Sequence, residues 1–474
     1  MIDGLKPHPE MKETGLPWLG RIPEHWQLKR MKFLLHERNE KGFPDEPLLA
    51  ATQTKGVVRK EDYENRTVLA LKDLHLLKHV RAGDFVISLR SFQGGIEYAR
   101  EQGIISPAYT ILYPKDQTTH GFLAWLFKSR LYIENLSLFV TGIRQGQNID
   151  YQRLSRSYLP LPPREDRESI VKFLAYADQR IRSYIRAKQQ LIKVLEEQRR
   201  AIIQRVLTGG LNPTVDTRPV GAWLGDIPKH WIPLQVRRLV SVVTSGSRGW
   251  AQYYSDTGKI FLQSGNLGSS MALNLSFIQH VNPPEGSEGM RTQVRRDDVL
   301  ICITGALTGN VALIDVDLPT AYVNQHVALL RPRAEKVLPR YLAFVLHSEI
   351  GKSQFKTSEY GGTKQGLSLD DVKSVIVPVP PVSEQQTIVA SLESQLKLLA
   401  APMTTAARGI SLVREYRNRL ISDVVTGKCD IRAVSRVLLE EIREPVVAAE
   451  MNGLDEDEET IDSSLEEAAE EAEA

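Results

Sequence analysis

Two short polar segments contain the residue types that read DNA bases. Each surrounds a glycine: Arg144, Gln145, Gly146, Gln147 and Asn148 form the first, and Lys364, Gln365 and Gly366 form the second. Arginine or lysine can bridge O6 and N7 of guanine, glutamine or asparagine can pair with N6 and N7 of adenine, and glycine lets the backbone come close. A solvated surface turn would have a similar composition. The recurrence of the pattern in both halves of the chain favours recognition.

Further polar side chains fall in turns next to apolar runs that have the character of strands. They are Arg90, Ser91, Gln93, Thr304, Thr308, Asn310, Gln325 and His326. Side chains of these types hydrogen-bond to base edges, although each one alone is a weak signal. Arg248 lies in a Ser-Gly-Ser-Arg-Gly turn and is a candidate phosphate contact.

No complete catalytic motif accompanies these candidates. The segment from Asn282 to Glu285 resembles the Asn-Pro-Pro-aromatic motif of amino-methyltransferases, but Glu285 has no ring to stack on an extruded base. The segment from Gly351 to Ser353 lacks the first glycine of a phosphate-binding loop, and Asp45 lacks the second carboxylate and the lysine of a nuclease site. The ten histidines and two cysteines show no metal-ligand spacing. The sequence therefore predicts a recognition protein with no catalytic residue, metal or cofactor of its own.

One sequence pattern occurs twice in the chain. Trp18 to Trp26 (WLGRIPEHW) returns as Trp223 to Trp231 (WLGDIPKHW), and the proline-rich segment from Pro160 to Pro163 returns from Pro378 to Pro381. The paired tryptophans predict an aromatic clasp that packs a short arm onto a domain. A duplicated module predicts a pseudo-two-fold molecule suited to a target that has two halves.

A long helix is predicted after each proline-rich segment. Proline ends the preceding strand, and the acidic residues Glu165, Asp166 and Glu384 suit a helix N-terminus. Apolar residues at intervals of three and four predict a coiled-coil seam. The seam residues are Leu174, Ile181, Leu191 and Leu195 in the first helix, and Leu392, Leu399, Val413 and Leu420 in the second.

The ends and the interior of these helices carry further signals. Gly209 and Gly427 are expected to end the two helices. Pro402 and Gly409 interrupt the second seam, so we expect a kink and looser packing there. With two such helices in one chain, antiparallel pairing within the chain is favoured over dimerisation through them.

The fold class predicted from these elements is α+β. Apolar runs at 83–88, 108–112, 298–303 and 327–330 predict strands, and amphipathic segments at 122–139 and 338–355 predict helices. Two tandem mixed α/β recognition domains are thus separated by two long antiparallel helices in a pseudo-two-fold repeat. The expected divisions are an arm (1–28), a first recognition domain (29–163), a long helix (164–210), a second arm (211–235), a second recognition domain (236–381), a second long helix (382–428) and a tail (429–474).

Charge is distributed unevenly along the chain. Residues 1–439 contain 59 Lys and Arg against 43 Asp and Glu, whereas the remainder contains 15 acidic residues and one arginine. A basic body attracts polyanions such as nucleic acid, because phosphates that are neutralised release their counterions. The acidic tail has few large apolar residues and is expected to be mostly disordered. The absence of long apolar runs and of a cysteine framework favours a cytoplasmic protein without membrane contact.

The doubled order of these segments resembles the specificity subunit of type I restriction-modification systems. The resemblance is carried by 18–26 and 223–231, 144–149 and 364–369, 160–163 and 378–381, 208–209 and 426–427, and 298–310. It implies that each recognition domain reads one half of a bipartite, asymmetric site in double-stranded DNA. It also implies that the paired helices set the spacer and dock two methyltransferase subunits. Leu367, which stands where the first loop has Gln147, and the acidic tail depart from the pattern.

The same resemblance implies that this chain is not an enzyme. S-adenosylmethionine, ATP and Mg²⁺ would then belong to partner subunits, which methylate adenine N6 or act as restriction and translocation subunits. A stand-alone bipartite DNA-binding regulator is the principal alternative, and an enzyme of unrecognised type is a third.

Overall fold

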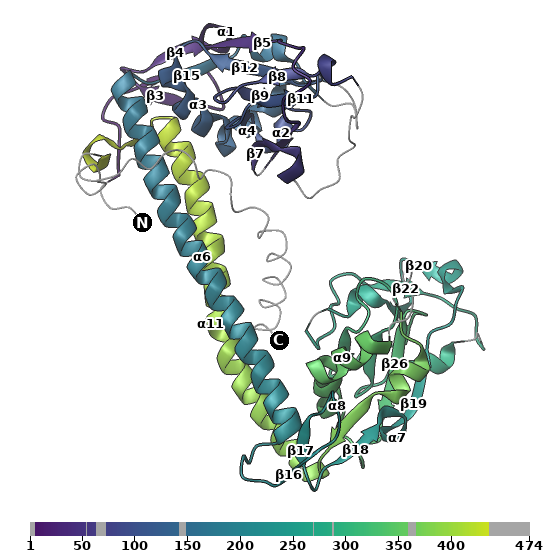
Figure 1. Ribbon diagram of the computed structural model, residues 1–474. Helices are drawn as coiled ribbons and strands as arrows, with labels where there is room; N and C mark the ends of the chain where they lie inside the picture. Colours follow the sequence, from purple (N-terminus) through teal and green to yellow (C-terminus); the bar gives the residue numbers. More distant parts are fainter. Residues whose placement is uncertain are drawn as a thin grey trace. The chain divides into compact units, whose positions relative to one another are not determined.

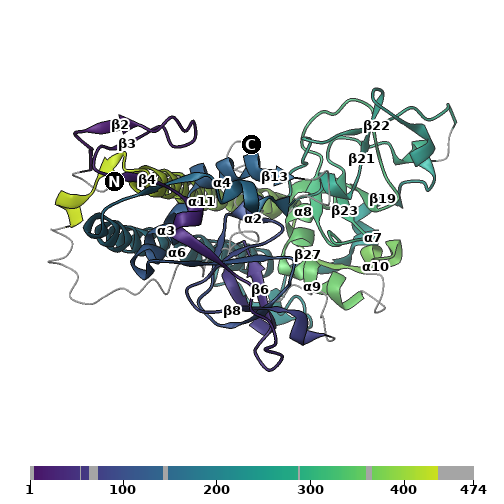
Figure 2. The same ribbon diagram turned by 90° about the horizontal axis from the view of Figure 1, so that it is seen from above.

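The structure is a computed structural model that describes residues 5–53, 55–62, 73–141, 148–268, 270–286, 289–358 and 366–435 (Figures 1 and 2). The chain forms two units. Of the described residues, the first unit contains those up to Lys188 together with those from Arg408 to Ser435, and the second contains Gln189 to Ala407. Each long helix therefore contributes one end to each unit.

The first unit is built on a four-stranded antiparallel sheet. Its strand order is β10 (Glu97–Tyr98), β9 (Phe85–Ile87), β12 (Thr110–Pro114) and β5 (Leu35–Arg38). Strands β9 and β12 confirm the strands predicted at 83–88 and 108–112. The described part of this unit also contains six separate two-stranded pairs: β1 (Lys6–Pro7) with β28 (Cys429–Asp430), β2 (Met11–Glu13) with β3 (Arg21–Pro23), β4 (Gln27–Arg30) with β15 (Tyr158–Leu161), β6 (Leu49–Thr52) with β7 (Gly56–Arg59), β8 (Lys78–Val80) with β11 (Gly103–Ile105), and β13 (Val140–Thr141) with β14 (Asn148–Ile149).

The second unit contains two four-stranded sheets. One has the order β19 (Val240–Ser245), β26 (Val327–Pro332), β23 (Val299–Cys302) and β24 (Val311–Leu313). The other has the order β20 (Tyr254–Ser255), β22 (Gln279–Val281), β21 (Lys259–Leu262) and β25 (Ala321–Val323), with β21 and β25 parallel. Strand β18 (Ile232–Gln235) pairs with β27 (Ile376–Val379), as β4 pairs with β15 in the first unit.

Each predicted amphipathic helix is in fact two helices. Segment 122–139 forms α3 (His120–Phe127) and α4 (Arg130–Leu136), and segment 338–355 forms α8 (Pro339–His347) and α9 (Glu349–Ser358). The breaks fall at the buried residues Ser129 and Ser348. Each hydroxyl donates a 2.7 Å hydrogen bond to a carbonyl three residues earlier, Leu126 O or Val345 O, so the serine satisfies the last turn of the helix that it ends.

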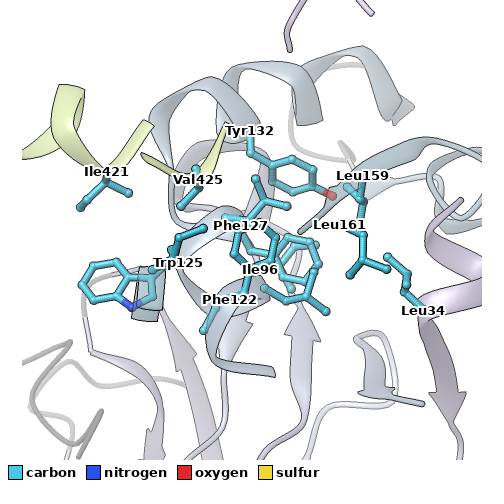
Figure 3. Close-up of a cluster of buried hydrophobic side chains, with 14 of the residues drawn as sticks. Leu34, Ile96, Phe122, Trp125, Phe127, Tyr132, Leu159, Leu161, Ile421 and Val425 are labelled. Carbon is cyan, nitrogen blue, oxygen red and sulfur yellow. The ribbon is translucent and has the colours of Figure 1, made fainter. Parts of the chain in front are cut away.

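The core of the first unit includes the end of the second long helix (Figure 3). Phe122, Phe127 and Tyr132 from α3 and α4 lie between the sheet and the long helices. Ile421 and Val425, more than 280 residues away in the sequence, belong to the same buried cluster. The long helix is thus part of the domain core.

The long helices are α6 (Arg164–Gly209) and α11 (Val382–Val425). In the first unit, Phe173 and Leu174 near the start of α6 share a core with Leu420 near the end of α11. In the second unit, Val206 at the end of α6 shares a core with Ile388 near the start of α11. The two helices therefore pair in antiparallel orientation, which confirms the prediction.

The buried seam differs from the predicted one in the middle of α6. Leu174, Ile181, Leu392 and Leu420 are buried, and Leu195, Leu399 and Val413 are partly buried. The assignment of Leu191 was wrong, because its side chain is 39% exposed while Ile192 is buried. A strict heptad spacing drifts relative to a helix of 3.6 residues per turn, so the buried stripe moves to the adjacent position.

Two helix signals also need correction. Gly209 is still helical, and Gly210, with φ +72°, is the left-handed residue that follows α6; Gly427 plays this part after α11 as predicted. Helix α11 continues without a break through Pro402, which is exposed and so lies outside the seam. A Cβ added to Gly409 would lie 3.1 Å from Tyr184 Oη, so this glycine leaves room for the tyrosine of α6.

Candidate nucleic-acid interface

The predicted polar turns of the second unit lie at one edge of its sheets. Strands β19 and β23 end where β26 begins, since Ser245 pairs with Ala328 and Cys302 with Val327. Backbone hydrogen bonds tie the turns together: Gly246 N donates to Asn324 O (3.1 Å), and Asn324 N donates to Leu262 O (2.9 Å). We call this set of turns, formed by residues 246–249, 263–268, 270–278, 303–310 and 324–326, the second polar edge.

Three predicted residues meet at this edge. The hydroxyl of Thr304 is hydrogen-bonded to Nδ1 of His326, and Gln325 Nε2 lies 2.9 Å from Nε2 of the same ring. Because the amide nitrogen of Gln325 is a donor, this arrangement assigns the ring proton to Nδ1. The network fixes the orientation of all three side chains.

Of the other candidate residues in this unit, two stabilise the turns and one is exposed to solvent. Thr308 Oγ1 donates to Gly305 O (2.7 Å) and closes its own turn, and Asn310 Nδ2 donates to Leu267 O (3.0 Å). These two side chains therefore brace the second polar edge. Arg248 is exposed, so its guanidinium is available to a phosphate.

In the first unit the corresponding turn follows β9 and contains α2 (Ser91–Gly94). Arg90 and Gln93 are exposed, and Gln93 Oε1 accepts a 3.2 Å hydrogen bond from Gln53 Nε2. Ser91 must be corrected: it is 1% exposed, and its hydroxyl accepts a hydrogen bond from Ser88 N (2.9 Å). Its side chain stabilises the turn and has no surface to offer a ligand.

A partly buried lysine holds this turn in place. Lys128 Nζ donates to Gln53 O (2.9 Å), Gly94 O (2.8 Å) and Glu97 Oε1 (2.8 Å). Burial raises the pKa of Glu97 to about 8, and the lysine opposes that rise. Gly95 (φ +87°) is required here, because a Cβ at this position would lie 2.4 Å from Phe127 O.

The two glycine-containing loops are described only at their ends. Arg144, Gln145 and Gln147, and likewise Lys364 and Gln365, lie outside the described residues. Asn148 is exposed in β14, which contacts α2. Gly366 forms an isolated bridge with Thr304, and Leu367 N donates to Ile303 O (2.8 Å). In each unit the described end of the loop thus adjoins the turn that follows the central strand.

Two features escaped the sequence prediction. Phe277, 88% exposed, lies in the second polar edge, and nothing in its sequence context separates it from core aromatics. The clasp tryptophans bond to the helix N-termini: Trp26 Nε1 donates to Asp166 Oδ2 (3.1 Å), and Trp231 Nε1 donates to Glu384 Oε1 (3.1 Å). The sequence indicates the tryptophans as a clasp and the acidic residues as helix N-terminal residues, but it does not indicate their contact.

Within the described part of the chain, no group of histidine, cysteine and carboxylate side chains is placed to hold a metal ion. Among the described helices, none combines the length and the apolar character needed to cross a membrane.

The fold and the repeated polar turns define a two-part recognition protein. Residues 291–401 match the family model of the type I restriction modification DNA specificity domain. The chain is 20% identical over 437 residues to the putative type I restriction enzyme MjaX specificity subunit of Methanocaldococcus jannaschii, covering 87% of this chain and 96% of that one. It is 22% identical over 321 residues to the type I restriction enzyme EcoBI specificity subunit of Escherichia coli, covering 63% of this chain and 66% of that one.

A solved structure has the same fold. A chain from a study of complex assembly and conformational transition of the type I R-M system matches with a TM-score of 0.64 at 17% identity, covering 85% of this chain and 98% of that chain. The predicted α+β fold class is thereby confirmed. The family match and the two relatives confirm the resemblance to type I restriction-modification specificity subunits that the sequence predicted.

Proposed function

We propose that this chain is the DNA-recognition subunit of a type I restriction-modification complex. The recognition domains at 29–163 and 236–381 each read one half of a bipartite site in double-stranded DNA. The observation that carries the proposal is that, in both units, the described end of a glycine-containing loop adjoins the turn after the central strand. The first turn offers Arg90 and Gln93, whereas the second offers Thr304, Gln325 and His326, so the two half-sites differ in sequence.

The long helices would set the unread spacer and dock two methyltransferase subunits. Exposed apolar side chains on both helices support this role, because water-exposed apolar surface favours a protein partner. They are Tyr184 and Leu412 in the first unit, and Leu191, Val194 and Leu398 in the second. The arms at 1–28 and 211–235 would hold the recognition domains to the helix ends.

Catalysis would belong to the partners. Methyltransferase subunits would bring S-adenosylmethionine and modify adenine N6, and restriction subunits would use ATP and Mg²⁺. The first experiment is co-expression of the chain with a methyltransferase subunit of a type I system from the same source. We expect a stable complex that methylates a bipartite site. A chain that stays alone and still binds such a site would support the regulator instead.

The second experiment assigns each domain to its half-site. Arg90→Ala should weaken binding through the first half-site by about 1–3 kcal/mol, as expected for the loss of a base contact. Arg248→Ala should weaken binding to all sequences. It should also reduce the slope of log K against log salt concentration by about one, because one phosphate contact is lost. Arg296→Ala is the matched control, because this exposed arginine lies before β23, away from the second polar edge, and pairs with Asp317. Equal loss at both half-sites with Arg90→Ala would contradict the division between domains.

A further inference from the structure

Phe277 is the most exposed large apolar side chain of the described residues, at 88%. It precedes strand β22, in the segment that connects β21 to β22 (Figure 2). An exposed phenyl ring gains nothing from burial in the fold, and a ligand that covers it would remove its apolar surface from water.

The segment that carries Phe277 is fixed by a buried asparagine. Asn266, 5% exposed, accepts a hydrogen bond from Gln263 N on Oδ1 (2.8 Å). Its Nδ2 donates to two carbonyls, Asn274 O (2.8 Å) and Phe277 O (2.9 Å). A single side chain therefore holds both ends of the loop, and the backbone of Phe277 is anchored directly.

The apolar neighbours of Phe277 point the other way. Leu267 is fully buried, and Leu275 and Ile278 pack against the same cluster beneath the second sheet. The loop thus has enough apolar side chains to fill its share of the core. Phe277 remains exposed on an anchored backbone. Binding a ligand therefore costs little further conformational entropy of the loop.

The ring stands at the second polar edge. Phe261 pairs with Gln279 and Leu262 pairs with Val323, so β22 begins where β21 and β25 end. The turn at 324–326 follows directly from β25, and Asn310 bonds the Phe277 loop to the turn at 303–310. Phe277 therefore shares an edge with the side chains that we propose to read DNA.

We propose that Phe277 contacts a DNA base in the second half-site, a role that rests on the proposed function of this chain. A phenyl ring has no hydrogen bond to offer a phosphate, and DNA presents apolar surface on the thymine methyl group and on the faces of the bases. Either contact gives the second domain an apolar element of recognition. The first domain has no exposed aromatic residue among the described residues of α2 or β14.

The test measures the affinity of the full-length chain for a short duplex that carries its target, selected with the wild-type chain from random DNA. Phe277→Ala should bind about five- to tenfold more weakly, in the range of the loss of one aromatic contact with a base. Phe277→Trp should retain most of the affinity. Phe33→Ala, which removes a 59% exposed ring in the first unit, before β5 and away from the turn after β9, should bind as the wild type does. The thermal midpoints of all variants should agree, since none removes a buried side chain.

Two further measurements identify the part of the DNA that the ring touches. Replacing thymine by deoxyuridine in the second half-site should weaken the wild type but not Phe277→Ala if the ring meets the methyl group. An increase in 2-aminopurine fluorescence that is lost in Phe277→Ala would instead show a ring inserted between bases. If the wild type binds DNA and Phe277→Ala binds equally well, this inference is wrong while the proposed function stands. If the wild type binds no specific duplex, alone or with its methyltransferase subunit, the proposed function fails first.

Discussion

The indole nitrogen of Trp26 donates a 3.1 Å hydrogen bond to the carboxylate of Asp166, 140 residues further along the chain. Asp166 lies in the first turn of α6, and the same ring packs against Gly427, directly after α11. One tryptophan therefore joins the start of one long helix to the end of the other. Trp231 does the same in the second unit, where it bonds to Glu384 and packs against Gly210.

This clasp should contribute to stability through its hydrogen bond. Trp26→Phe keeps an aromatic ring but removes the donor, so the free energy of unfolding should fall by about 1–3 kcal/mol, the usual cost of losing a bond to a charged acceptor. Trp231→Phe should cost a similar amount. Urea denaturation followed by circular dichroism measures both. Trp223→Phe, at a 40% exposed position, is the control and should change little; a loss as large there would show that the bond to the carboxylate is not the cause.

The glycines that follow the two long helices should differ in their tolerance of alanine. A Cβ on Gly427 would lie 2.3 Å from Pro23 Cδ, and the residue has φ +72°. At Gly210 the same φ applies, but the nearest atom lies 3.2 Å away. Gly427→Ala should therefore destabilise the protein by well over the roughly 1 kcal/mol expected for the left-handed backbone alone, and Gly210→Ala by about that amount.

Gly209→Ala is the matched control for this pair. Gly209 is helical and has no atom within 4 Å of an added Cβ, so alanine should leave stability unchanged or raise it by up to about 1 kcal/mol. Thermal unfolding of the three variants gives the order. A Gly427→Ala variant as stable as Gly209→Ala would mean that the contact with Pro23 relaxes freely.

A buried carboxylate links α6 to α11 in the first unit. Asp178 Oδ2 accepts from Arg182 Nε (2.6 Å), and its Oδ1 accepts from Arg417 Nε (2.5 Å). Asp178 and Arg182 are 5% and 7% exposed. Asp178→Ala should cost about 3–5 kcal/mol, because it leaves buried positive charge without this partner.

An ion pair on α11 that includes an exposed arginine serves as the comparison for Asp178. Arg419 lies 3.6 Å from Asp423 with 83% of its side chain exposed, so Arg419→Ala should change the free energy of unfolding by less than about 1 kcal/mol. Chemical denaturation of both variants compares the two. Equal effects would mean that the charges around Asp178 are compensated elsewhere.

The pH dependence of stability should reveal Glu97. Burial raises its pKa to about 8 from 4.5, so the folded state favours the protonated acid. Stability from this group is complete below pH 4.5 and is lost as the pH rises towards 8. Relative to Glu97→Gln, which stays neutral, the wild type should lose about 2–4 kcal/mol between pH 5 and pH 8. Denaturation of both proteins at several pH values tests this; parallel curves would show that Lys128 keeps Glu97 ionised throughout.

Several parts of the architecture could be predicted because they depend on local order along the chain. The doubled WLG–IP–HW pattern predicted two equivalent arms, the proline-rich segments predicted the starts of α6 and α11, and the runs at 83–88 and 298–303 predicted the central strands. The break at Ser129 and the shift of the seam from Leu191 to Ile192 were missed. The break depends on the hydroxyl of Ser129, which satisfies the last turn of α3, and the seam shift depends on the drift of a heptad pattern along a helix of 3.6 residues per turn.

The sequence by itself determined the repeat, the two long helices and the resemblance to specificity subunits, because strand and helix periodicity, proline and glycine act within a few residues of each other. Only the tertiary structure decided which polar side chains reach the surface. Ser91 is buried within its own turn, Asn310 bonds to Leu267 in another loop, and Phe277 is exposed, since each outcome depends on the path of the folded backbone and not on the residue type. The same holds for Trp26 and Asp166, whose residue types were evident from the start but whose contact arises only when the arm, α6 and α11 come together.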